Sequence, residues 1–94
     1  MSDLTEQYIQ QAYKLYHAGQ RADALAQLRA VLAISPRLPA VWLQIGILLI
    51  EEFQTHGAER HLLEAREALQ TALRERPDWE EAQQWLSIAL STHL

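Results

Sequence analysis

The chain contains no cysteine. This absence excludes disulfide bonds, thiolate metal sites and cysteine nucleophiles, and it fits a reducing cytoplasm, where we expect the protein to work. Basic residues are scarce and scattered: eight of them against twelve acidic residues give a formal net charge of -4. Nucleic-acid binders show a basic stripe and anionic membranes attract basic clusters, so we expect neither kind of partner.

Other absences exclude further classes of function. The N-terminal residues lack the basic and apolar regions of a secretory signal, and the longest apolar stretch, Ile45–Ile50, is far shorter than the roughly 20 residues of a membrane span. No glycine-rich phosphate loop is present, and no serine has the sequence context of a nucleophile. The adjacent pairs Glu51–Glu52 and Glu80–Glu81 point in different directions on a helix. We therefore expect no enzymatic activity and no cofactor.

Glycine and proline are few, and they divide the chain into five segments with helical periodicity. Gly19 and Gly57 are expected to end helices, and Asp3 and Asp78 have capping-box spacing to a glutamate three residues on. The connections are short, so successive helices should pack antiparallel. The helices are expected over residues 3–18, 21–34, 39–56, 58–75 and 78–93.

One helical segment occurs twice, 41 residues apart. A helical unit that recurs at such a period predicts a stack of units, because a single unit cannot bury its apolar face alone. Stacks of this kind usually bind other proteins. Ala24, Leu28, Leu32 and Pro36 recur as Ala65, Leu69, Leu73 and Pro77.

The sequence resembles the tetratricopeptide repeat (TPR) family, whose unit is a hairpin of two helices. The match departs from the family pattern at Gln11, Val31 and Gln83, the last of which stands where the pattern has an aromatic residue. The matching residues are Tyr8, Ala12, Leu15, Ala24, Leu28 and Pro36 in the first unit, Trp42, Ile45, Gly46, Leu49, Ala65, Leu69, Ala72 and Pro77 in the second, and Leu86, Ser87 and Leu90 in the last helix.

The resemblance implies an all-α fold in which antiparallel hairpins stack as a short right-handed superhelix of five helices. Residues 1–94 would form one domain, with repeat one at about 5–38, repeat two at about 39–79 and a cap helix at about 79–93. Met1 and the cap helix favour a complete protein. The small residues Ala12, Gly46 and Ser87 are expected where two helices approach closely.

The second unit is seven residues longer than the first. Each of its helices gains about one turn, so we expect a hairpin taller by roughly 5–6 Å rather than a loop. Phe53, Leu62 and Leu63 would then pack on each other at the tip. The alternative is that the tip forms a second contact surface.

In TPR proteins a concave wall formed by the first helix of each unit binds the partner. One subclass grips a carboxylate there with Asn and Lys or Arg, whereas apolar residues hold the corresponding positions here. The third helix is apolar on nearly all sides, so it must be covered on both faces. Either the fifth helix covers the wall within the monomer, or the wall is a groove that accepts an apolar partner. The partner-binding residues predicted on this wall are Ile9, Tyr13, Tyr16, Leu43, Ile47, Ile50, Gln84 and Ile88.

We therefore expect a non-enzymatic adaptor that binds an apolar helix or peptide segment of another protein. A homodimer formed through the same surface is the alternative. A third hypothesis is a metal-binding helical protein that uses His56 and His61 at the hairpin tip, with Glu52 and Glu59 close by, since imidazole and carboxylate groups bind zinc.

Overall fold

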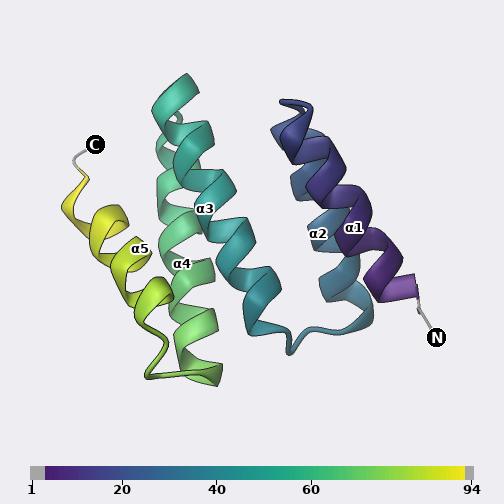
Figure 1. Ribbon diagram of the computed structural model, residues 1–94. Helices are drawn as coiled ribbons and strands as arrows, with labels where there is room; N and C mark the ends of the chain where they lie inside the picture. The colour runs from purple at the N-terminus through teal and green to yellow at the C-terminus, as the bar shows by residue number, and fades with distance from the viewer. Residues whose placement is uncertain (1–3, 93–94) are drawn as a thin grey trace.

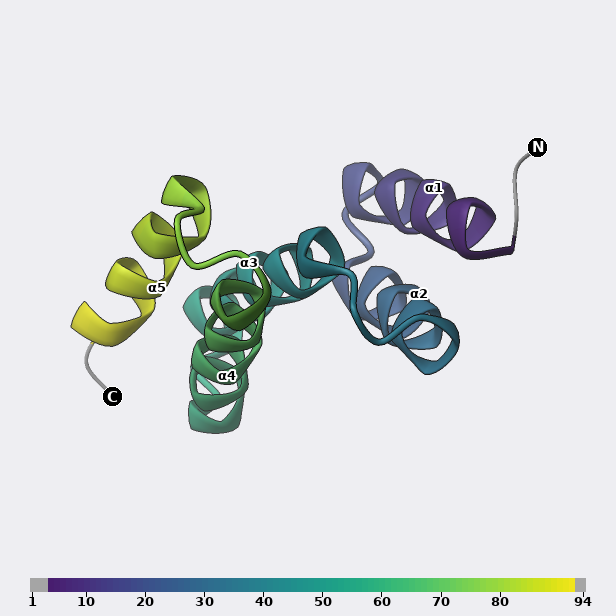
Figure 2. The same cartoon turned by 90° about the horizontal axis from the view of Figure 1, so that it is seen from below.

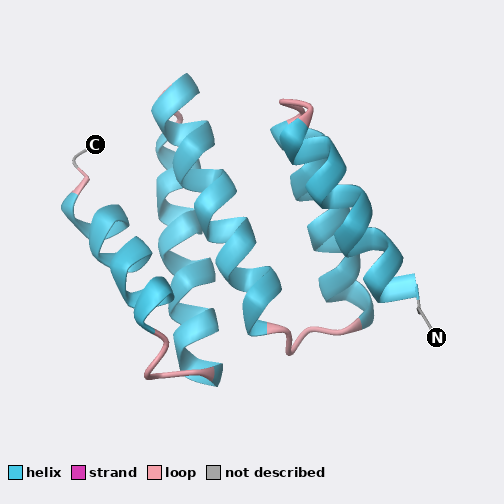
Figure 3. Ribbon diagram, in the orientation of Figure 1, coloured by secondary structure: helices cyan, strands magenta, loops and turns pink. Residues whose placement is uncertain are grey.

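The computed structural model describes residues 4–92, and within that range it consists of helices joined by short loops, with no strand (Figures 1 and 3). This confirms the predicted all-α fold of five helices and most of the expected helix bounds. The helices are α1 (Leu4–His17), α2 (Arg21–Ile34), α3 (Pro39–His56), α4 (Glu59–Glu75) and α5 (Glu80–Ser91).

Two glycines end helices as predicted. Gly19 has a φ of 81°, its N–H bonds the carbonyl of Tyr16, and the next N–H, of Gln20, bonds the carbonyl of Leu15, which together form a Schellman motif. Gly57, with φ 72°, ends α3 through one bond from its N–H to the Phe53 carbonyl at 2.7 Å. A β-carbon would strain both positions, so the two hairpin turns depend on glycine.

The capping box expected at Asp78 is wrong. Trp79 is the residue that precedes α5, and no side chain caps this helix. The half-buried Trp79 ring packs against the core, and the guanidinium of Arg76 lies 4.2 Å from its centre. The helix α5 therefore begins without a carboxylate cap, directly after a tryptophan that packs against the core. The other expected box, at Asp3, lies outside the described residues.

The helices form two hairpins, α1–α2 and α3–α4, and α5 packs on the second hairpin. Figure 2 shows α2 and α4 on the same side of α1 and α3. The central helix α3 contacts α2, α4 and α5, which explains why it is apolar on nearly all sides. It buries seven residues, whereas α1, over its described residues, buries Ala12 alone.

The second hairpin is closely packed at Gly46. A β-carbon at this position would lie 2.7 Å from Cγ of Leu69, so only glycine permits this crossing without movement. In the first hairpin the corresponding residues are Ala12 and Leu28, both buried. Ser87 was expected at a third crossing, but it is exposed, because no helix packs on this side of α5 within residues 4–92.

The two connections that lead from one unit to the next share two features, the dihedral angles of their first residue and a hydrogen bond to the proline carbonyl. Ser35 and Arg76 occupy equivalent positions with φ/ψ of -137°/88° and -137°/81°. In each connection a side chain six residues after the proline donates to the proline carbonyl: Trp42 Nε1 to Pro36 at 2.9 Å, and Gln83 Nε2 to Pro77 at 2.8 Å. Gln83 therefore supplies the hydrogen bond that the tryptophan makes in the first connection.

The longer second hairpin is helical throughout its extension. Its helices have 18 and 17 residues, against 14 in each helix of the first hairpin. Leu62 is fully buried and Phe53 is half-buried, but Leu63 is exposed. The expectation that all three pack together is therefore wrong for Leu63, which points away from the core.

Candidate functional site

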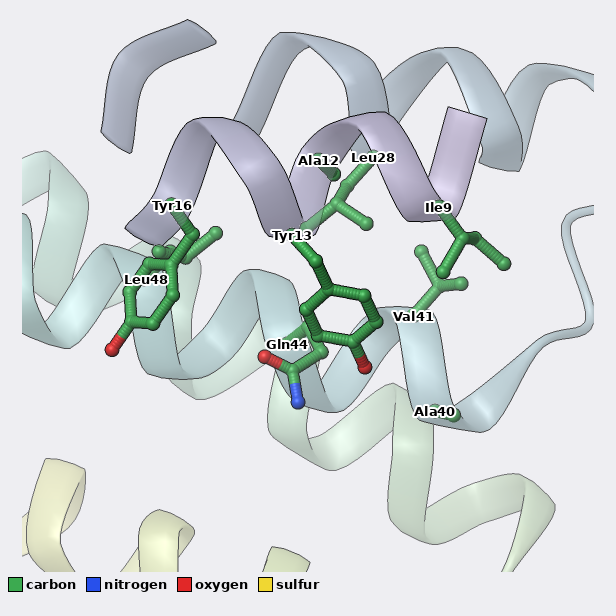
Figure 4. Close-up of a pocket in the computed structure, with 9 residues that line it drawn as sticks. All are labelled: Ile9, Ala12, Tyr13, Tyr16, Leu28, Ala40, Val41, Gln44 and Leu48. Atoms are coloured by element: carbon green, nitrogen blue, oxygen red, sulfur yellow. The ribbon is translucent and has the colours of Figure 1, made fainter. Parts of the chain in front are cut away.

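A small apolar hollow lies where α1 passes α3 (Figure 4). Figure 4 shows Tyr13 and Tyr16 reaching from α1 toward Gln44 and Leu48 of α3. The hollow has a volume of about 50 Å³, roughly a third of a cavity that holds benzene. This volume is enough for the end of an aliphatic side chain, about two methyl groups, and too small for a whole helix. Its lining residues are Ile9, Ala12, Tyr13, Tyr16, Leu28, Ala40, Val41, Gln44 and Leu48.

The structure brings together three of the predicted wall residues. Ile9, Tyr13 and Tyr16 all line the hollow from α1. The side chain of Tyr13 is 47% exposed, which is high for an aromatic ring. It therefore forms an accessible rim, or lip, of the hollow. Ile9 and Tyr16 are half-buried and pack against the core.

Two predicted wall residues belong to the core instead. Leu43 is only 2% exposed and Ile50 only 1% exposed, so neither side chain is accessible to a partner. They lie seven residues apart on one face of α3, a helix that packs against α2, α4 and α5. Both side chains are therefore covered within the monomer.

The remaining predicted residues do not reach the hollow. Ile47 is half-buried and packs against the core. Gln84 and Ile88 are on α5 and exposed, with Ile88 at 42%. The predicted wall is thus not one continuous groove, because α5 does not line the hollow that α1 and α3 form.

The α3 side of the hollow consists of four residues, none of which is among the predicted partner-binding residues: Ala40, Val41, Gln44 and Leu48. The error is a rotation of about one residue around the α3 axis, roughly 100°. The signal that could have corrected it is polar. Gln44 and Glu51, seven residues apart, lie on the side of α3 that faces α1, and Glu51 accepts a hydrogen bond from the Tyr16 hydroxyl.

A network of polar contacts, which we call the seam, joins the first hairpin to α3 beside the hollow. The Tyr16 hydroxyl donates to Oε1 of Glu51 at 2.9 Å. Next to it, Arg21 donates from Nε to Oε1 of Glu52 at 2.7 Å and from Nη2 to Oγ1 of Thr55 at 2.8 Å. The carboxylates of the hairpin extension therefore tie α3 to the first hairpin.

This network affects proton binding. The hydrogen bond to Glu51 raises the pKa of the Tyr16 phenol above its ordinary value of 10.0, and burial and the carboxylate charge add to the effect. The hydrogen bond to Glu52 raises the pKa of the Arg21 guanidinium in the same way. The phenol therefore stays protonated, and able to donate to Glu51, to a higher pH than an ordinary tyrosine does.

The tip histidines do not form a metal centre. His56 Nε2 lies 3.4 Å from Oε2 of Glu52, while His61 is half-buried at the start of α4. Within residues 4–92, no three His, Asp or Glu side chains are grouped so that they could hold a metal ion. In that same range, none of the helices combines the length and apolarity needed to cross a membrane.

No family model matches the chain, and neither curated proteins nor solved structures gave a match. The similarity to TPR proteins therefore depends on the residues quoted from the sequence.

Proposed function

We propose that this protein is a non-enzymatic adaptor of the TPR type, and that it binds another protein by taking up the end of one aliphatic side chain between α1 and α3. The observation that carries the proposal is the hollow itself, with its apolar lining and the exposed ring of Tyr13 on its lip. Exposed apolar surface beside a preformed hollow is typical of protein-binding sites.

The size of the hollow indicates the kind of partner. A volume of about 50 Å³ suits the end of a Val, Leu or Ile side chain that projects from a helix or extended segment. The rest of that segment would lie along the surface beside Tyr13 and Gln44. The TPR resemblance supports this location, because family members bind partners on the wall formed by the first helix of each unit. The absence of cysteine fits a cytoplasmic adaptor.

Selection from a random peptide library displayed on phage tests the proposal. We expect the enriched peptides to share one aliphatic residue, and to lose binding at least about tenfold to Tyr13→Glu, which places a charge on the lip. Leu63→Glu is the matched control, because Leu63 is 45% exposed and lies on α4, away from the hollow. Peptides that bind the Tyr13→Glu and native proteins equally would contradict the proposal.

Light scattering at several protein concentrations separates the alternative of self-association. We expect a monomer at all concentrations for both the native chain and Tyr13→Glu. A native dimer that Tyr13→Glu converts to a monomer would show that the surface binds a second copy instead. Tyr13 is a better site for this test than Ile47, because Ile47 packs against the core and its substitution would also affect folding.

A further inference from the structure

The outer face of α5 is the structural equivalent of a face that is already covered elsewhere in the same molecule. The connection from α4 to α5 resembles the connection from α2 to α3 in the dihedral angles of its first residue and in the hydrogen bond to the proline carbonyl. In addition, α5 buries Ala82 and Ala89, which stand 41 residues after the buried Val41 and Leu48 of α3. The helix α5 is therefore placed on its hairpin as α3 is placed on the one before it.

On α3, the corresponding outer face is covered by α4. Gly46 faces Leu69, while Ile45 lines a shared crevice with Ala68. Ile45, Gly46 and Leu49 are all buried as a result.

On α5, the equivalent residues are open. Leu86, Ser87 and Leu90 stand 41 residues after Ile45, Gly46 and Leu49, and with Leu73 of α4 they line a wide, shallow hollow of about 430 Å³. Leu90 is 55% exposed, the highest value of any large apolar side chain in the described residues. We call Leu73, Leu86, Ser87 and Leu90 the α5 outer face.

We propose that the α5 outer face binds an amphipathic helix of another polypeptide, which lies antiparallel to α5 with a leucine over Ser87 and alanines around it. The molecule itself shows this occupant, because α4 presents Leu69 between Ala65, Ala68 and Ala72 to the equivalent face of α3. This surface is separate from the hollow between α1 and α3 and goes beyond the proposed function.

The serine at this crossing is compatible with a leucine on the partner. Gly46 leaves no room for a β-carbon beneath Leu69, but the first hairpin pairs Ala12 with Leu28, and both are buried. A β-carbon is thus accommodated when the two helices lie slightly farther apart. Ser87 is small enough for the second arrangement, whereas a bulky or charged residue at 87 would prevent contact.

Titration of the full chain with a blocked synthetic peptide of residues 58–76, followed by amide chemical shifts, tests the proposal. This peptide is α4 acting as a separate helix, and its four Glu and four Arg side chains give it no net charge. We expect shifts centred on residues 83–91, and at least about tenfold weaker binding to Leu90→Glu and to Ser87→Arg. A peptide with Leu69→Asp should not bind.

Ile88→Glu is the matched control, because Ile88 is also on α5 and 42% exposed but does not line the α5 outer face. We expect this variant to bind the peptide as the native chain does. Absence of binding, shifts centred on α1 and α3, or equal loss in Ile88→Glu would overturn the proposal. Association of the native chain with itself that Leu90→Glu abolishes would overturn it too, by showing that a second copy occupies the face.

The outcome does not depend on the hollow between α1 and α3. Tyr13→Glu is expected to bind the peptide normally, and Leu90→Glu is expected to bind the phage-selected peptides normally. Failure of one proposal would therefore leave the other unaffected.

Discussion

The two hairpins repeat one sequence pattern but differ in how tightly their helices pack. In the second hairpin, Gly46 brings α3 against Leu69 so closely that no β-carbon fits. In the first hairpin the same crossing has Ala12 and Leu28, and both residues border the hollow. The comparison shows that the crossing of the second hairpin excludes a β-carbon, whereas the crossing of the first hairpin contains one.

The hairpins also differ in what surrounds them. The helix α3 is covered by three other helices, whereas α1 packs mainly on α2. At the extended tip, the first hairpin is attached to the second through partly exposed polar contacts, such as Tyr16 with Glu51 and Arg21 with Glu52. A third contact, from Arg29 to Glu64, links α2 with α4 and is exposed. Exposed ion pairs contribute little to stability, so the first hairpin is the less stable unit.

The largest expected effect on stability comes from a substitution in the core of the second hairpin. Leu69→Ala should lower the free energy of unfolding by about 2–5 kcal/mol, because it removes a fully buried side chain and leaves a cavity. Leu28→Ala should cost less, about 2 kcal/mol, since Leu28 already borders unfilled space. Urea unfolding followed by circular dichroism measures both values. Equal losses would contradict the difference in packing.

The next effect tests the crossing directly. Gly46→Ala should destabilise the protein by about 1–3 kcal/mol through overpacking, although alanine is intrinsically the better helix former by about 1 kcal/mol. In a Leu69→Ala background, where the space is free, the same substitution should be neutral or stabilising. Stabilisation by Gly46→Ala in the native background would show that the crossing is looser than described.

The smallest effect concerns the seam. Tyr16→Phe removes the hydrogen bond to Glu51 and should cost about 1 kcal/mol at neutral pH. Folding raises the pKa of Tyr16, so this contribution is complete below the unfolded value of about 10 and is lost as pH rises through the higher folded value. The stability difference between native and variant should therefore be constant up to about pH 9 and shrink above pH 10. A difference that stays the same above pH 10 would contradict this account, because it would mean that the hydrogen bond does not raise the pKa of Tyr16.

The sequence predicted the helices well because their boundaries depend on local signals. Gly19, Gly57 and the prolines act within a few residues of their own position, and the 41-residue repeat identified α2 and α4 as equivalent. The start of α5 was misplaced because the capping-box spacing at Asp78 does not correspond to a side-chain cap in the structure.

The candidate site could be predicted from α1 but not from α3. The helix α1 has one apolar side, so Ile9, Tyr13 and Tyr16 were found. The helix α3 is apolar nearly all round, and apolar periodicity therefore carries no information about which side faces α1. Leu43 was chosen where Gln44 lines the hollow, although the polar residues Gln44 and Glu51 mark the side of α3 that faces α1.

The central claim is that the second hairpin is tightly packed, and that the first hairpin, beside the binding hollow, is less stable. Native-state hydrogen exchange tests this claim most directly. The account predicts that amides of α3 and α4 exchange only through global unfolding, whereas amides of α1 open with a clearly lower free energy. Uniform protection across all four helices, or stronger protection in α1 than in α3, would contradict it.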